Sequence, residues 1–196
     1  MANPKVRGSI ANGTSPNRCP DDFYATPPGF TELLTDCISL HERIWEPTAG
    51  DGAISDVLEA KGHKVKKTDL KPRRDDIQQL DILNCQEVWD GDIVLNPPFR
   101  HLIPVIEACW GHLQDGRTLA FVGPLSVVNS SKRFSSIWSV MSPKMLILAP
   151  RYQHIRCDRG VLPSQFTHLW CVLEKGWDGP CSFVWGPDVV YKADIV

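Results

Sequence analysis

Hydrophobic positions along the chain follow two periods, which predict helices and buried strands in alternation. Apolar residues spaced three and four apart predict amphipathic helices, and this spacing occurs in residues 30–41, 54–58, 102–113 and 134–141. Short apolar or alternating runs predict strands, and these runs are residues 44–46, 63–69, 92–95, 118–122, 145–149 and 166–173. Gly62 stands where the second helix needs a C-terminal cap.

The order of these segments predicts an α/β fold built on one mostly parallel sheet. Strands that alternate with helices are joined by right-handed crossovers, which put the helices on both faces of the sheet. Residues 145–149 and 166–173 have no helical pattern between them, so they predict a hairpin and one antiparallel strand near an edge. The polar residues 1–20 predict a flexible N-terminal tail, and residues 21–196 a single domain.

Composition narrows the class of protein. The 196 residues are 42% hydrophobic and 22% charged, as in a globular domain, and the net charge of -2 argues against coating nucleic acid by charge alone. The single cysteines form no C-x-x-C pair and the histidines show no ligand spacing, so we expect neither a disulfide framework nor a metal site. No apolar run is long enough to cross a bilayer. We therefore expect no membrane partner and a cytoplasmic location, the host cytoplasm if a phage encodes the chain.

The segment 46–52, Glu-Pro-Thr-Ala-Gly-Asp-Gly, lies between a predicted strand and a predicted helix. Glycines in such a turn let the backbone approach a ligand closely, beyond the carboxyl ends of the strands. Asp69 ends the next predicted strand, where a carboxylate can accept hydrogen bonds from both hydroxyls of a ribose. Together these features predict a nucleoside-binding site. Ser55 stands where a dinucleotide fingerprint would have its third glycine, which disfavours a dehydrogenase.

The motif Asn96-Pro97-Pro98-Phe99 directly follows the predicted strand 92–95. Two prolines stop the strand, because they have no N–H with which to continue the ladder. A rigid turn that exposes a phenylalanine is one interpretation. The motif also offers a planar amide, fixed carbonyl groups and an aromatic ring at one strand end, which suit a flat ligand that carries an amino group.

In their order along the chain, these motifs resemble those of small phage-type DNA N6-adenine methyltransferases, a family of S-adenosylmethionine-dependent amino-methyltransferases. Residues 46–52 are similar to the cofactor motif, 96–99 to the catalytic motif, 23–28 to the upstream cofactor segment and 169–175 to the last strand. The resemblance implies a Rossmann-like methyltransferase fold with a seven-stranded, mostly parallel sheet. It also implies S-adenosylmethionine as cofactor and methyl transfer to N6 of adenine in DNA, with low or short sequence specificity because no large recognition domain is present.

The resemblance further implies roles for individual residues. The residues implied to bind the cofactor are Tyr24, Thr26, Pro27, Glu46, Thr48, Ala49, Gly50, Asp69, Asp81, Ile82 and Asn96. Within this set Asp69 would hold the ribose, and Asp81 and Ile82 would meet the adenine ring of the cofactor. The residues implied for catalysis are Asn96, Pro97, Pro98 and Phe99. The residues expected to contact the substrate, mostly in the basic loop before the last strand, are Phe99, Lys132, Arg133, Arg151, Tyr152, His154, Arg156 and Arg159.

The chemistry follows from the groups themselves. An amino nitrogen on an aromatic ring is a poor nucleophile because its lone pair is conjugated with the ring. If the Asn96 side-chain oxygen and the Pro97 carbonyl each accept one N–H, the nitrogen can pyramidalise and its lone pair can point at the sulfonium methyl. Aligned acceptors stabilise the developing positive charge, and no general base is needed before transfer. Phe99 would stack on a flipped base.

Several alternatives stay open at the level of sequence. Many relatives carry Asp and Tyr where Asn96 and Phe99 stand, and Asn-Pro-Pro-(Tyr/Phe) also occurs in enzymes that methylate RNA guanine or protein glutamine. We therefore expect DNA as partner, with RNA second, and a monomer or dimer. A non-catalytic nucleic-acid-binding remnant of the cofactor fold is the alternative to an enzyme. The basic residues within 64–74 predict either a phosphate contact or a solvated surface.

Overall fold

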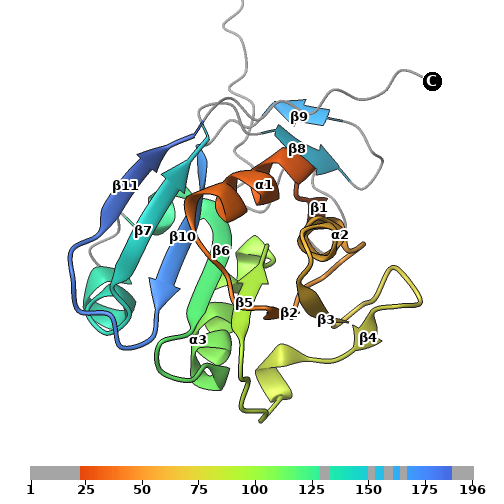
Figure 1. Cartoon of the computed structure of the whole chain (residues 1–196), viewed down its shortest axis with the longest axis horizontal. Coiled ribbons are helices and arrows are strands. Elements are labelled where there is room, and N and C mark those ends of the chain that lie inside the picture. The colour runs from red at the N-terminus through yellow and green to blue at the C-terminus, as the bar shows by residue number, and fades with distance from the viewer. Residues whose placement is uncertain (1–22, 129–132, 150–152, 157–160, 164–166, 187–196) are drawn as a thin grey trace, which may run out of the picture.

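One eight-stranded sheet runs through the centre of the molecule in the strand order β11-β7-β10-β6-β5-β2-β3-β4 (Figure 1). The computed structural model describes residues 23–128, 133–149, 153–156, 161–163 and 167–186. The strands of this sheet are β2 (Arg43–Glu46), β3 (Lys64–Asp69), β4 (Gln78–Gln79), β5 (Asp92–Leu95), β6 (Thr118–Pro124), β7 (Pro143–Leu148), β10 (His168–Glu174) and β11 (Ser182–Trp185). All of them except β4 and β11 correspond to strands predicted from the sequence.

The strand directions confirm the predicted α/β arrangement. β2 pairs in parallel with β3 and β5, and β5 pairs in parallel with β6. β10 is antiparallel to both β6 and β7, so the predicted hairpin and its antiparallel strand are confirmed. The sheet has eight strands rather than the expected seven, because the chain turns at Gly176 (φ 89°) and β11 returns beside β7.

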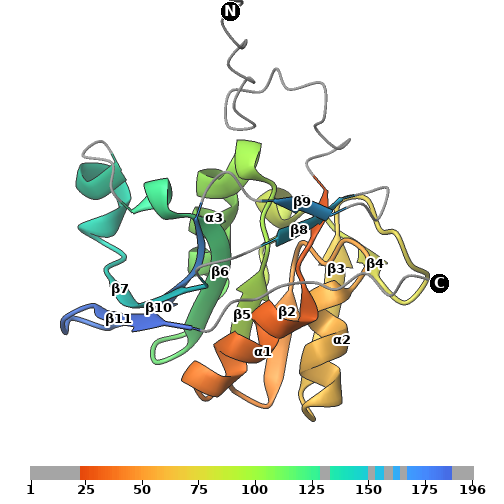
Figure 2. The same cartoon turned by 90° about the horizontal axis from the view of Figure 1, so that it is seen from above.

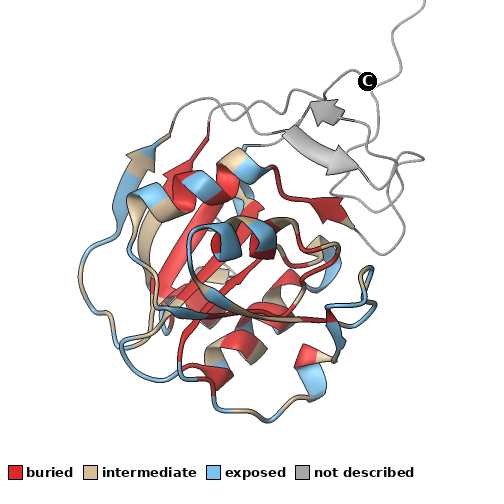
Figure 3. Cartoon of the chain, turned by 45° about the vertical axis from the view of Figure 1, so that its right-hand side comes forward, coloured by how far each residue is buried: buried red, intermediate tan, exposed pale blue. Residues whose placement is uncertain are grey.

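Helices cover both faces of the sheet, as predicted (Figure 2). α1 (Pro28–Cys37) and α2 (Ala53–Ala60) lie on one face, and α3 (Leu102–His112) lies on the other. Alternate strand residues enter the two cores: Ile93 and Leu95 pack with α3, whereas Val94 packs with α1 and α2. The buried strands therefore lie between helices that are only half buried (Figure 3). Among the described residues, no helix combines the length and the apolar character needed to cross a membrane.

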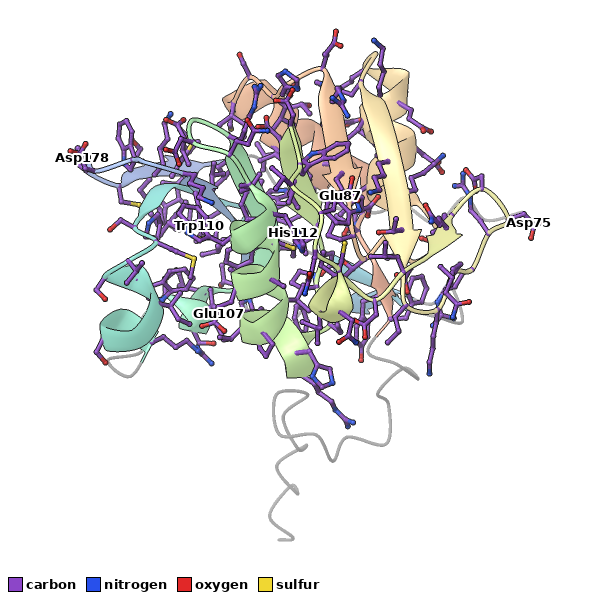
Figure 4. All side chains as sticks on the ribbon, turned by 90° about the horizontal axis from the view of Figure 1, so that it is seen from below. Asp75, Glu87, Glu107, Trp110, His112 and Asp178 are labelled. Carbon is purple, nitrogen blue, oxygen red and sulfur yellow. The ribbon has the colours of Figure 1, made fainter. Side chains whose placement is uncertain are left out.

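Buried polar contacts close the amino ends of the parallel strands. Asp92, which is 4% exposed, accepts hydrogen bonds from His41 N at 2.7 Å and from Thr118 N at 2.8 Å. α1 ends at Cys37, before the predicted limit at residue 41, and Ile38 adopts an extended conformation. At the end of α3, the His112 ring bonds to the carbonyl of Glu87 (Figure 4).

The helix predicted over residues 134–141 is shorter than expected. Among the described residues, the helical conformation ends with the π-helical segment η6 (Phe134–Trp138), and a turn follows. The Ser139 hydroxyl bonds back to the Ser135 carbonyl at 3.3 Å, and the Ser142 hydroxyl bonds to the Trp138 carbonyl at 3.1 Å. Serine hydroxyls that bond to carbonyls four residues earlier compete with regular helix geometry.

A second sheet lies over the carboxyl ends of the large sheet. Its strands are β1 (Tyr24–Ala25), β8 (Gln153–Arg156) and β9 (Val161–Pro163), in the order β1-β8-β9. The sequence predicted an irregular loop between β7 and β10, and this expectation is wrong for β8 and β9. β8 pairs with the backbone edge of β1, with Tyr24 opposite Arg156 and Ala25 opposite Ile155, and β9 pairs with β8.

Trp45, Trp138 and Trp170 are buried in the core. Trp170 of β10 stacks on Phe30 of α1 with ring centroids 5.4 Å apart. Its indole Nε1 also donates to the Phe30 carbonyl at 2.7 Å. The pair therefore fixes α1, and the segment that precedes it, against the sheet.

Replacing Trp170 with Phe should lower the free energy of unfolding by about 1–3 kcal/mol, because the buried Phe30 carbonyl loses its donor and a cavity opens. Urea denaturation followed by circular dichroism measures the change. Trp185→Phe is the matched control, since Trp185 is 68% exposed and its replacement should change stability by no more than about 0.5 kcal/mol. Equal losses in the two variants would contradict this account of the α1 contact.

Candidate active site

A cavity of about 600 Å³ opens at the carboxyl ends of β2, β3 and β5, beneath β1. Ligand sites in open α/β sheets lie at this edge, and the volume is in the range of small-molecule sites. The predicted site residues that line the cavity are Tyr24, Thr26, Glu46, Thr48, Ala49, Gly50, Asp69, Asp81, Ile82, Asn96 and Pro98. The structure thus brings the two sequence motifs to one cavity. In the described part of the chain, the lining omits Pro27, Pro97 and Phe99.

The glycine turn after β2 requires a backbone that other residues rarely adopt. Gly50 has φ 58° and Gly52 has φ 84°, both in the left-handed region. A Cβ on Gly50 would lie 2.6 Å from the ring of Phe23, so the turn also needs a residue without a side chain. Phe23 lines the cavity, but the sequence did not single it out as a site residue. The sequence signal that could have identified Phe23 was its position in the segment before α1.

The carboxylate of Asp69 is held by the backbones of two loops. Its Oδ2 accepts from Gly50 N at 2.8 Å, and its Oδ1 accepts from Lys71 N at 2.7 Å. These bonds orient both oxygens at the end of β3 and tie the glycine turn to the neighbouring strand. Each oxygen keeps a further lone pair with which to accept from a ligand hydroxyl.

Glu46 is an almost completely buried acid, 1% exposed, at the end of β2. Its Oε2 accepts from Ser55 N at 2.9 Å and also from the Ser55 hydroxyl. Burial raises the pKa of Glu46 well above its ordinary value, the two Ser55 bonds lower it in part, and the nearby charges of Asp51 and Asp69 raise it. A cationic ligand group in the cavity would stabilise the ionised form of this acid.

Asn96 connects the catalytic motif to the strand that covers the cavity. Its amide Nδ2 donates to the Tyr24 carbonyl at 2.9 Å and to the Thr26 hydroxyl at 3.1 Å. The Thr48 hydroxyl donates to the backbone carbonyl of Asn96 at 3.2 Å. Because both bonds of the amide use its nitrogen, the side-chain oxygen is the acceptor that the amide can offer to a ligand.

Phe99 packs among other aromatic rings beside the cavity. Its centroid lies 6.5 Å from that of Tyr24 and 5.5 Å from that of His168, and both pairs are stacked. His168 is a buried strand residue, as predicted from its place in the pattern. The carbonyl of Pro98 accepts from His101 N at 2.9 Å as the turn η4 (Phe99–His101) begins. Stacking of a base on Phe99 remains a prediction.

Asp81 has a local structural role. Its Oδ1 accepts from Leu83 N at 3.0 Å and its Oδ2 accepts from the Asn84 amide at 2.7 Å, which caps the turn η3 (Ile82–Asn84). Ile82 is 5% exposed and joins the core as well as the cavity lining. Both residues line the cavity, and their contact with the adenine ring of a cofactor remains a prediction.

The predicted substrate contacts are only partly within the described residues. Lys132, Arg151, Tyr152 and Arg159 lie outside them, and the structure describes the backbone of His154 and Arg156 in β8. Arg133 Nη1 donates to the Ser126 carbonyl at 2.8 Å. Four basic residues that the sequence did not assign to the cavity also line it: Lys71, Arg73, Arg100 and His101.

The basic stretch 64–74 is largely neutralised by carboxylates. Lys64 pairs with Glu42 at 3.2 Å and Lys66 pairs with Glu87. Two further pairs involve one acid, since Lys67 lies 2.6 Å and Arg74 2.7 Å from Asp76. These contacts favour the solvated-surface interpretation for the four paired residues. Among the described residues, no group of three or more His, Cys, Asp or Glu side chains is arranged to hold a metal ion.

Comparison with known proteins identifies the fold. No protein-family model matches the chain, and no curated protein matches it. It is similar to a solved protein from Listeria monocytogenes assigned to the class I S-adenosylmethionine-dependent methyltransferases, with 15% identity and a TM-score of 0.57. The likeness covers 81% of this chain but 62% of the Listeria protein, so the chain spans less than two thirds of that relative.

Two further solved structures have the same fold. A SAM-dependent O-methyltransferase from Thermotoga maritima is 16% identical, with a TM-score of 0.52 over 78% of this chain and 67% of its own. A protein from Pyrococcus horikoshii assigned as an RNA methyltransferase is 13% identical, with a TM-score of 0.56 over 75% of this chain and 84% of its own. The Rossmann-like methyltransferase fold expected from the sequence is therefore confirmed.

Glu46→Gln should stabilise the ligand-free protein at neutral pH. With a raised pKa, the folded state holds the Glu46 proton more tightly than the unfolded state. Wild-type stability therefore falls as pH rises from the ordinary pKa of Glu through the raised one, and Gln removes this loss. We expect a gain of about 1 kcal/mol or more at pH near 8 and a smaller gain near pH 5, by urea denaturation. Glu32→Gln, on the exposed face of α1, is the control. Identical pH profiles of the unfolding free energy for wild type and Glu46→Gln would contradict a raised pKa of Glu46.

Proposed function

We propose that this chain is an S-adenosylmethionine-dependent methyltransferase that modifies the exocyclic N6 of adenine in DNA. The observation that carries the proposal is the meeting of the glycine turn and the Asn-Pro-Pro-Phe corner in one cavity. Glu46 and Gly50 line it at and after the end of β2, Asp69 at the end of β3, and Asn96 and Pro98 after the end of β5. A methyl donor and an acceptor amino group need this proximity, because direct transfer requires their alignment.

The chemistry of the cavity fits the proposed cofactor. Asp69 offers two fixed carboxylate oxygens to ribose hydroxyls, and Gly50 leaves the backbone open to close approach. Glu46 lies among the other acids of the lining, where an ammonium group would compensate its buried charge. When bound, S-adenosylmethionine supplies an activated methyl group on a sulfonium sulfur. The solved methyltransferases of the same fold support this choice of cofactor.

The chemistry of the acceptor follows from the amide of Asn96. Its nitrogen is engaged by Tyr24 and Thr26, so its oxygen is the group with which it can accept an N–H. Such a bond would help an aromatic amino nitrogen to pyramidalise and would stabilise the positive charge that develops as the C–N bond forms and the C–S bond of the donor breaks, which leaves the sulfur as a neutral thioether. The amino group then releases one proton to water. This acceptor geometry favours an amino nitrogen over a hydroxyl oxygen as the methylated atom.

DNA is proposed as substrate from the ordered motifs that resemble DNA N6-adenine methyltransferases. The backbone of β8, which carries His154 and Arg156, is joined to β1 beside the cavity. Arg100 and His101 add basic groups to the cavity rim next to the catalytic motif. A short basic rim on a chain with net charge -2 suits a few phosphate contacts near one flipped base.

A transfer assay tests the substrate class. The full chain, incubated with tritiated S-adenosylmethionine, should label unmethylated DNA, and nucleoside digestion should identify N6-methyladenine by mass. RNA and a glutamine-bearing release-factor protein are assayed in parallel. Label found only in RNA or only in protein would overturn the DNA proposal, and no label with tight cofactor binding would favour a non-catalytic binding protein.

Asn96→Ala should abolish transfer while cofactor binding stays within about threefold of wild type, because most of the residues implied to contact the cofactor lie outside β5 and the motif that follows it. Loss of one positioned acceptor typically costs roughly 100-fold or more in kcat. Asp69→Ala is the complementary variant and should weaken cofactor binding first. Calorimetry with S-adenosylmethionine and the tritium assay separate the two effects. An Asn96→Ala enzyme with wild-type kcat would exclude the assigned role.

A further inference from the structure

We propose that Thr26, together with the Tyr24 carbonyl, is a positioning element. The two groups hold the Asn96 amide so that its oxygen faces the amino group that accepts the methyl. This inference rests on the proposed function, since it assigns a task to Asn96 in that reaction. It gives Thr26 a role beyond the cofactor contact implied by the sequence. It also gives a reason why this chain carries Asn rather than Asp at position 96.

The two partners of the amide fix its orientation by their hydrogen-bonding properties. An asparagine amide has two N–H donors on one side and an acceptor oxygen on the other. Both N–H groups have acceptors, at 2.9 Å on Tyr24 O and 3.1 Å on Thr26 Oγ1. A backbone carbonyl can only accept, so a half-turn of the amide would bring two oxygens face to face at Tyr24.

Burial makes the Thr26 bond difficult to replace. Thr26 is 1% exposed and Tyr24 is 6% exposed, so bulk water has little access to the acceptors. An N–H left without a partner in such a place costs free energy instead of turning to solvent. Thr48 donates to the backbone carbonyl of Asn96, which fixes the backbone that carries the side chain.

The same geometry disfavours aspartate at this position. A carboxylate has no N–H, so an ionised aspartate in place of Asn96 would direct an oxygen at the Tyr24 carbonyl, where the amide now donates at 2.9 Å. Only the protonated acid could donate there and still offer its other oxygen to the substrate. The position of β1, the strand that covers the cavity, therefore requires a hydrogen-bond donor at residue 96. β1 is itself paired with β8.

Kinetics of three threonine variants test the lock. Thr26→Val keeps the shape of the side chain but removes the hydroxyl that accepts the hydrogen bond from Asn96. We expect kcat to fall by about tenfold or more while the Kd for S-adenosylmethionine changes by less than about threefold. Thr26→Ser restores a hydroxyl and should recover kcat to within about threefold of wild type. Thr31→Val is the matched control, because Thr31 is 0% exposed and, within the described residues, its hydroxyl has no hydrogen-bond partner. It should leave kcat unchanged.

A spectroscopic measurement tests the same lock without turnover. In ¹⁵N-labelled protein, the side-chain NH₂ resonance pair of Asn96, identified by its loss in Asn96→Asp, should be protected from exchange with water. Protection should persist in Thr26→Ser and Thr31→Val and fall at least about tenfold in Thr26→Val. Asn96→Asp should be nearly inactive at neutral pH, and its kcat relative to wild type should rise as pH falls.

The outcomes separate the lock from the proposed function. A wild-type enzyme that methylates an amino group, with an unchanged kcat in Thr26→Val, would overturn the positioning role. A Thr26→Ser variant as impaired as Thr26→Val would also overturn it, because the hydroxyl would not be the active group. If protection is lost only in Thr26→Val and the wild-type protein transfers no methyl group, the lock would be supported and the proposed function overturned.

Discussion

Two hydrogen bonds from the Asn96 amide join segments that are 72 and 70 residues apart, and the arrangement of the cavity depends on them. They hold β1 over the carboxyl ends of the parallel strands, so that one short strand covers the cavity and also supports the β8–β9 hairpin. The Phe30–Trp170 contact fixes α1 directly behind β1. A change at either contact would alter β1, the Asn-Pro-Pro-Phe motif and the β8–β9 hairpin together.

The cavity combines features that cost stability with features suited to binding a charged ligand. Glu46 is buried beside other acids, which raises its pKa and destabilises the empty protein at neutral pH. Gly50 and Gly52 adopt left-handed conformations in the same turn, and Phe23 packs where a Gly50 side chain would lie. Such features are typical of binding sites, because a bound cation and a nucleoside recover the free energy that the empty site loses.

The residues that form the fold differ from those that would select a substrate. Solved methyltransferases share the sheet and its ligand edge with this chain, although their sequences are 13–16% identical to it. Their substrates differ, as the O-methyltransferase and the protein assigned to RNA show. The shared fold therefore does not determine the methyl acceptor, and under the proposed function the amide of Asn96 and the basic residues that line the cavity would provide that chemistry.

The sequence by itself determined the order of strands and helices, the antiparallel β10 and the two motifs, because hydrophobic periodicity and turn residues are local properties. It also indicated Asp69 and Asn96 as candidate site residues, because Asp69 ends a predicted strand and Asn96 directly follows one. Only the tertiary structure decided that β11 adds an eighth strand and that β1 pairs with the β8 strand of the β8–β9 hairpin, because edge pairing depends on a partner far away in the chain. The contact of Thr26 with Asn96 was equally hidden, since local spacing carries no information about which atoms of distant segments meet.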